Sequence, residues 1–176
     1  RLVLAGCVCT DSRPSFVTMI HGIFIINNHG KARLIKVYNK VSSDTQKLVR
    51  ELFLMVSKRP DNVCNFLEGG STSSWGSDTR LIYRHYATLY FVFVVDQQES
   101  ELGILDLVQV FVETLDKCFE NVCELDLIFH SDKVHYVLDE IVMGGMVLET
   151  NISDIVSALM EMTTLERNTS SAAVKT

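Results

Sequence analysis

The stretch LIYRHYATLYFVFVV, residues 81–95, decides the fold. Residues 81–86 and residues 88–95 each have the length and the aromatic and β-branched composition of a strand. The connection between them is short, which favours antiparallel pairing. The second segment is apolar on both faces, as is typical of a strand that is covered on both sides. Residues 88–95 are therefore expected at the centre of a sheet.

Upstream, residues 20–38 have the pattern of a β-hairpin. Residues 20–26 are an apolar run of strand length, and residues 32–38 alternate between the two faces of a second strand. Between them lies NNHG at 27–30, a turn sequence in which the glycine easily takes a positive φ. A further short strand is predicted at 63–67, before a flexible glycine- and serine-rich loop that runs from 69 to 78.

Four segments have the features of helices. Asp44 can cap the first, in which Leu48, Leu52 and Val56 recur at a spacing of four. The others are residues 101–122, residues 125–143 up to Gly144-Gly145, and a last helix from Asn151 to about Glu166. Residues 101–122 carry two neighbouring apolar stripes, which is more than one sheet face requires. A second helix or a partner should therefore cover the remainder.

This order of elements, two strands, a helix, three strands and then helices, predicts an α+β fold. We expect a five-stranded, mostly antiparallel sheet packed with helices. The length of 176 residues fits one domain. Residues 1–18 show no clean period and form an unassigned N-terminal extension, residues 19–166 form the domain, and the polar residues 167–176 are expected to be a flexible tail.

Charge and composition exclude several classes of function. The formal net charge is −6, and no basic stripe of the kind that nucleic-acid-binding proteins carry is visible. The same charge disfavours direct docking on anionic lipid, so any membrane contact should be indirect, through partners. The sequence indicates no nucleic-acid partner.

Catalytic and metal-binding motifs are absent from the sequence. It contains no P-loop, Gly-x-Ser-x-Gly or His-Glu-x-x-His pattern. His130 and His135 are five positions apart, which splays them on a helix and makes a shared metal ion a poor expectation. We predict no enzyme activity, no cofactor and no metal site. One enzymatic alternative stays open, a small enzyme that uses Cys64 or Cys118 with a histidine.

Four stretches together resemble the clathrin-adaptor small-chain family. LIYR and LYF at 81–84 and 89–91 look like its signature, and NNHGKARL at 27–34 resembles its first hairpin. FENVCELDLIF at 119–129 resembles its helix junction, and VMGGMVLET at 142–150 resembles the segment before its last helix. Residues 62–70 and 99–106 are most similar to one subtype, the sigma chains of the third adaptor-protein complex. The signature residues are Leu81, Ile82, Tyr83, Arg84, Leu89, Tyr90 and Phe91.

The resemblance implies a longin-like (SNARE-like) fold and a non-enzymatic role. It implies a heterotetramer with large delta-type and beta-type chains and a medium mu chain. Such a complex is recruited by an Arf-family GTPase and works in the cytoplasm, peripherally on Golgi, endosome and cytoplasmic vesicle membranes. It sorts cargo from endosomes or the trans-Golgi to lysosomes and lysosome-related organelles. Another longin-type trafficking subunit, such as the coatomer zeta chain, is the alternative within this class.

The resemblance also implies a site for acidic dileucine signals, in which an acid precedes two adjacent bulky apolar residues. Arg33 would face the acidic residue of the cargo. The leucine pockets would be lined by Ala87, Leu89, Val112, Asn121, Val122 and Leu127. The apolar members of this set would be core residues in any folded domain, so the assignment rests on the resemblance.

Overall fold

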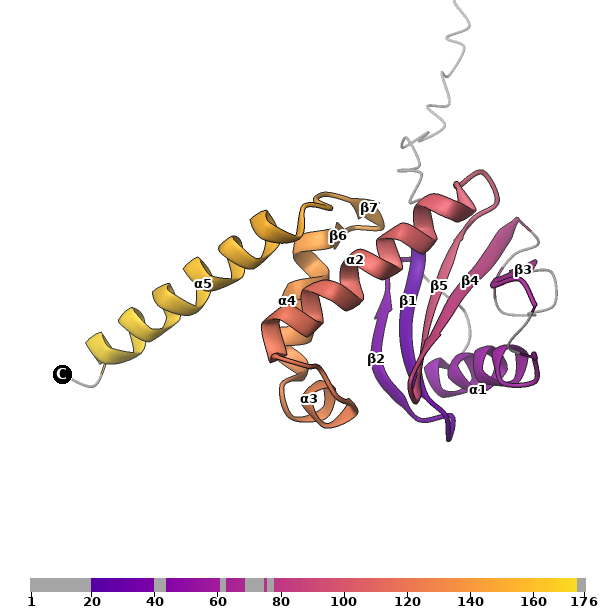
Figure 1. Cartoon of the computed structure of the whole chain (residues 1–176), viewed down its shortest axis with the longest axis horizontal. Coiled ribbons are helices and arrows are strands. Elements are labelled where there is room, and N and C mark those ends of the chain that lie inside the picture. The colour runs from indigo at the N-terminus through magenta and orange to yellow at the C-terminus, as the bar shows by residue number, and fades with distance from the viewer. Residues whose placement is uncertain (1–19, 40–43, 61–62, 69–74, 76–77, 174–176) are drawn as a thin grey trace, which may run out of the picture.

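The computed structural model describes residues 20–39, 44–60, 63–68, 75 and 78–173. The expectations for residues 1–18, for most of the loop at 69–78 and for the last three residues of the tail lie outside these ranges. Figure 1 shows a twisted sheet with helices on both of its faces and one long helix that leads away from it.

The sheet has five strands in the order β2-β1-β5-β4-β3, and every neighbouring pair is antiparallel. Strand β5, Leu89–Asp96, is the middle strand, as the sequence predicts. Its Phe91 and Phe93 join the core on one face, and its Val92 and Val94 join the core on the other. The other strands are β1 Ile20–Asn27, β2 Ala32–Val37, β3 Phe66–Glu68 and β4 Thr79–Tyr86.

Helices cover the two faces unequally (Figure 1). Helix α1, Thr45–Val56, lies on one face, where the Asp44 side chain accepts a hydrogen bond from the Gln46 amide and so caps the helix. Helix α2, Glu101–Phe119, lies on the other face. Helices α4, Ser131–Ile141, and α5, Ile152–Ala173, pack on α2. The wide apolar surface of α2 is thus covered in part by further helices of the same chain.

The single helix predicted at 125–143 is wrong. The structure has a short helix α3, Glu124–Phe129, then α4 from Ser131, with His130 between them at φ −122° and ψ 40°. Leu127 and Val134 are both buried and lie seven positions apart, so a helical period runs unbroken through the sequence. No proline or glycine marks the break, and the apolar spacing alone conceals it.

Gly144 and Gly145 also act differently from the prediction of a helix end. Both have a positive φ, 60° and 85°, and form the two-residue turn between β6, Val142–Met143, and β7, Met146–Val147. Two central residues with positive φ suit the right-handed twist of a hairpin. Helix α4 therefore ends earlier than expected, at Ile141.

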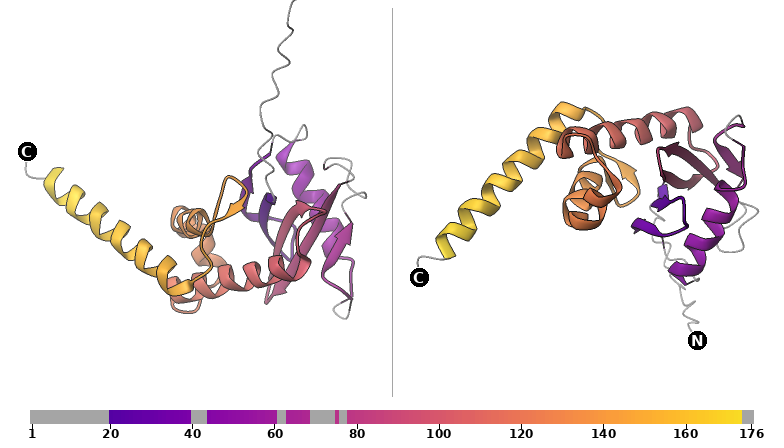
Figure 2. Two further views of the ribbon diagram at one scale, coloured as in Figure 1. Left: turned by 90° about the horizontal axis from the view of Figure 1, so that it is seen from above. Right: turned by 60° about the horizontal axis from the view of Figure 1, so that its bottom comes forward.

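The last helix begins as predicted and ends later. The Asn151 side chain accepts a hydrogen bond from the Ser153 amide at the start of α5. Buried Ile155 and Leu159 hold the first part of α5 against the body. The helix then continues beyond the expected end near Glu166 to Ala173, leading away from the sheet in all three views (Figures 1 and 2).

Candidate functional site

Three chain reversals meet at one end of the molecule. They are the β1–β2 turn, the β4–β5 turn and the junction between α2 and α3. The amide of Asn28 in the first turn donates to the carbonyl of Thr88 in the second, over 2.9 Å. Glu124, the first residue of α3, contacts Asn27 and Arg33 of the first hairpin. The residues predicted for cargo binding come from these reversals and from the adjoining part of α2.

The backbone at these reversals is unusual. Among the described residues other than glycine, only Ala87, Glu120 and Asn121 have a positive φ, at 52°, 52° and 81°. Such a conformation costs on the order of 1–3 kcal/mol for a residue with a side chain, and it is concentrated at functional sites. Ala87 and Asn121 both belong to the predicted site, and although asparagine adopts this conformation readily, the sequence gives no sign of it at Ala87.

The six residues predicted to line the leucine pockets differ in depth. Leu89 and Leu127 are buried, with 8% and 1% of their surface exposed. Val112 and Val122 are half-buried and pack against the same core cluster. Ala87 and Asn121 are exposed. The four apolar residues thus belong to the same core cluster, with two of them inside it and two nearer the solvent.

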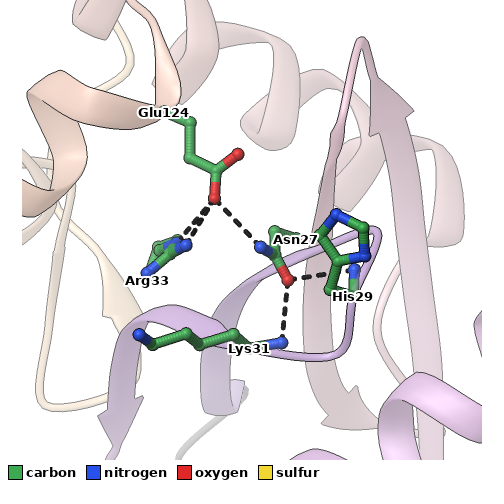
Figure 3. Close-up of polar contacts among 5 residues, drawn as sticks. All are labelled: Asn27, His29, Lys31, Arg33 and Glu124. Atoms are coloured by element: carbon green, nitrogen blue, oxygen red, sulfur yellow. Dashed lines mark hydrogen bonds and ion pairs between the residues drawn. The ribbon is translucent and has the colours of Figure 1, made fainter.

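The side chain of Arg33 is already paired within the chain, whereas the resemblance predicts that it faces the acidic residue of a cargo. Its Nε and Nη2 atoms lie 2.8 and 2.6 Å from Oε1 of Glu124, and its side chain is only 13% exposed (Figure 3). Asn27 donates from Nδ2 to the same oxygen over 3.0 Å. These hydrogen bonds, first that of Arg33 and then that of Asn27, lower the pKa of Glu124 below its ordinary value. Glu124 is therefore ionised at neutral pH.

Asn27 ties this ion pair to the turn. Its side chain is buried, and its Oδ1 accepts hydrogen bonds from the amides of His29 and Lys31 at 3.1 and 2.8 Å (Figure 3). The carbonyl oxygen of its side chain therefore binds the turn backbone, and the NH2 group of its side chain binds Glu124. Sequence reasoning missed both Asn27 and Glu124 as members of the site. The partners lie 97 and 91 positions apart, so no local pattern could join them.

Two aspartates fix the α2–α3 junction. Oδ1 of Asp116 accepts from the Val122 amide at 3.1 Å, and Oδ2 of Asp126 accepts from the Cys123 amide at 2.9 Å. The hydrogen bond from Cys123 lowers the pKa of Asp126. The backbone that presents Asn121 and Val122 is thus held from both sides.

The signature residues serve the fold. Most of them lie in the two cores of the sheet, namely Leu81, Ile82, Tyr83, Leu89 and Phe91. Arg84 donates to the hydroxyl of Tyr86 and to Oε1 of Gln109 on α2, at 2.8 and 2.7 Å. Tyr90 stacks on His85 with ring centroids 4.3 Å apart. The signature therefore describes how β4, β5 and α2 are joined.

The cysteine alternative finds little support. Burial raises the pKa of the half-buried Cys118 thiol, which disfavours the thiolate that a nucleophile needs. Cys64 is exposed, and its carbonyl accepts from Arg59 at 2.8 Å. Within the described ranges, no cluster of three or more His, Cys, Asp or Glu side chains is placed to hold a metal ion.

Over the described part of the chain, none of the helices has the length and apolar character needed to cross a membrane.

Comparison with known proteins decides the family. Residues 19–166 match the family model of the clathrin adaptor complex small chain. The chain belongs to this family. The small chain is 66% identical to AP-3 complex subunit sigma-2 of Homo sapiens over 151 residues, which cover 85% of this chain and 78% of that relative. It is 66% identical to AP-3 complex subunit sigma of Dictyostelium discoideum over 141 residues, which cover 79% and 82%.

The fold agrees with this membership. The small chain is similar to a chain of a homology model of the full-length AP-3 complex in a stretched open conformation, with a TM-score of 0.65 and 43% identity. The likeness covers 88% of this chain and 99% of that one. The predicted longin-like α+β fold is confirmed by this likeness and by the five-stranded antiparallel sheet. As an adaptor sigma-type chain, the protein works in vesicle-mediated protein transport.

Proposed function

We propose that this adaptor small chain is the sigma subunit of an AP-3-type heterotetramer with delta-type, beta-type and mu chains. The observation that carries the proposal is its 66% identity to AP-3 sigma chains of both an animal and an amoeba. The domain is residues 19–166, preceded by an extension at 1–18 that is dispensable for assembly and followed by a tail at 167–176. The chain acts by binding, without catalysis or a cofactor.

The complex brings the chain to membranes that the chain itself does not enter. An Arf-family GTPase recruits it to Golgi, endosome and cytoplasmic vesicle membranes, and its cargo travels to lysosomes and lysosome-related organelles. The net charge of −6 is compatible with recruitment through partners rather than through anionic lipid. The test is purification of the tagged full chain from cells, followed by identification of the partners. Recovery of coatomer chains in place of large adaptor chains would contradict the proposal.

Within that complex, the chain binds acidic dileucine signals. Half-buried Val112 and Val122 offer partly exposed apolar surface at the margin of the core that contains Leu89 and Leu127. Burying one leucine side chain contributes about 1.5–3 kcal/mol. Because Leu89 and Leu127 are buried in the free chain, a cargo leucine reaches them only if the side chains that cover them move apart. Exposed Asn121 offers an amide to the extended backbone of the cargo.

The sharpest test of this site is Val112→Asp. A carboxylate at an apolar wall must be desolvated or must exclude the cargo leucine, and either costs several kcal/mol. We expect loss of peptide binding to the complex of this chain with the large delta-type chain. Val110→Asp is the matched control, because Val110 is also half-buried on α2 but lines a separate pocket, with Ile104 and Val147, that contains none of the predicted site residues.

The control peptide carries serines in place of the two leucines. Unchanged binding to Val112→Asp, while the serine peptide fails to bind, would place the dileucine site elsewhere on the complex. Equal losses for Val112→Asp and Val110→Asp would indicate damage to α2 rather than to a binding surface.

A further inference from the structure

We propose that Glu124 sets how strongly the site selects for the acidic residue of its cargo, because its carboxylate shares the guanidinium of Arg33 with the carboxylate of the ligand. The inference rests on the dileucine function proposed above. In this role the carboxylate of Glu124 competes with the carboxylate of the cargo for Arg33 and so lowers the affinity of the site for an acidic residue.

The geometry leaves room for two carboxylates on one guanidinium. Both contacts from Arg33 and the one from Asn27 go to a single oxygen of Glu124, Oε1. A guanidinium has five N–H donors, and Glu124 engages the Nε–H and one N–H on Nη2. The other donors can still meet a ligand. The side chains of Arg33 and Glu124 are 13% and 27% exposed, so the pair is largely buried but still borders the solvent.

Charge makes the sharing unfavourable for an acidic ligand. The ion pair cancels most of the positive charge that Arg33 would otherwise present. A second carboxylate on the same guanidinium also lies within a few ångströms of the first, where like charges repel. A ligand with a neutral residue at that position experiences neither effect. Glu124 should therefore reduce the preference for acidic over neutral ligands while leaving the leucine contacts unchanged.

Glu124→Gln tests this directly. The glutamine carbonyl has the same reach and can still accept from Arg33 and Asn27, so the guanidinium keeps its place while the negative charge is removed. Two peptides are used, one with glutamate and one with glutamine before the two leucines. Their affinities are measured for the complex of the full chain with the large delta-type chain. The ratio of the two affinities is the acid preference.

We expect Glu124→Gln to raise the acid preference roughly two- to fivefold, the effect of one partly solvated charge pair. Affinity for the glutamine peptide should stay unchanged. Glu124→Asp retains the charge near Arg33 with a shorter reach, so it should raise the acid preference less than Glu124→Gln does. Asp139→Asn is the matched control, because Asp139 pairs with Lys36 on the same strand as Arg33, over 2.7 Å, but from α4.

The results separate the two proposals. An acid preference that stays the same or falls in Glu124→Gln would overturn the role of Glu124 as competitor and leave the dileucine site standing. The same holds if Glu124→Asp or Asp139→Asn raises the preference as much as Glu124→Gln does. A serine peptide that binds as tightly as the leucine peptide would overturn the dileucine function, and the role of Glu124 with it.

Discussion

Any side chain at Gly30 in the β1–β2 turn should lower the stability of the fold. The φ of Gly30 is +79°, and a Cβ there would lie 2.9 Å from Cδ1 of Phe53 on α1. The left-handed backbone alone costs an L-residue about 1–2 kcal/mol. Forcing the Phe53 ring to move adds about 1–3 kcal/mol, the usual range for overpacking. Gly30→Ala should therefore lower the free energy of unfolding by roughly 2–5 kcal/mol, the sum of these two ranges.

Tryptophan fluorescence offers the assay. Trp75 is the only tryptophan of the chain and is 6% exposed, so unfolding in urea should change its emission. Gly144→Ala is the matched control, because Gly144 has a φ of +60° but nothing within 4 Å of the added Cβ. The free energy of unfolding of Gly144→Ala should fall only by the cost of the left-handed backbone, about 1–2 kcal/mol. Equal losses in the two variants would refute the claim that Phe53 restricts Gly30.

Three further results are expected. Leu127→Ser should abolish peptide binding and also lower the free energy of unfolding by about 2–5 kcal/mol, because Leu127 is 1% exposed. Urea midpoints should show that this variant is less stable than Val112→Asp. Because the pKa of Glu124 is lowered from 4.5, its contribution to stability is complete above about pH 4.5 and is lost as the pH falls through its lower folded value. Melting temperatures from about pH 5 down to about pH 3 should therefore fall less in Glu124→Gln than in the parent, and equal slopes would contradict this. A chain that starts at Met19 should melt within about 2 °C of the full chain, and a larger drop would show that residues 1–18 belong to the domain.

The sequence predicts the sheet well because its strongest signals are local. The apolar run at 88–95 has hydrophobic side chains on both faces, and β5 is indeed buried from both sides. Each hairpin turn lies within a few residues of the strands that it joins, so pairing could be inferred from neighbours. The Gly144-Gly145 pair also carried a hairpin signal, but the helical period before it favoured the wrong interpretation.

The break at His130 could not be inferred in the same way. Leu127 of α3 and Val134 and Leu138 of α4 are buried in the same core cluster, and a continuous helix would present the same spacing. The position of such a break depends on the elements that each helical segment packs against. Here α3 contacts the edge strand β2 as well as α4. That information is tertiary and lies outside any window of the local sequence.

The resemblance gives the apolar members of the candidate site, and their use as a cargo site stays a prediction, but it does not say how deeply they lie. The resemblance supplied their positions, and the structure shows Leu127 inside the core and Val112 at its margin. This difference changes how variants are interpreted. Loss of binding in Leu127→Ser mixes unfolding with loss of the site, whereas the half-buried Val112 offers a cleaner probe.

The polar part of the site shows why a residue type alone does not determine a role. The resemblance predicts that Arg33 faces the acidic residue of a cargo, yet Arg33 already pairs with Glu124, to which buried Asn27 also donates a hydrogen bond. The acid preference of such a site depends on the difference between two carboxylates, one of the protein and one of the ligand, at the same guanidinium. Removing Arg33 would therefore also leave Glu124 to repel an acidic ligand. Arg33→Ala alone thus reports two losses at once, and only in a Glu124→Gln background does it measure what Arg33 contributes to the ligand.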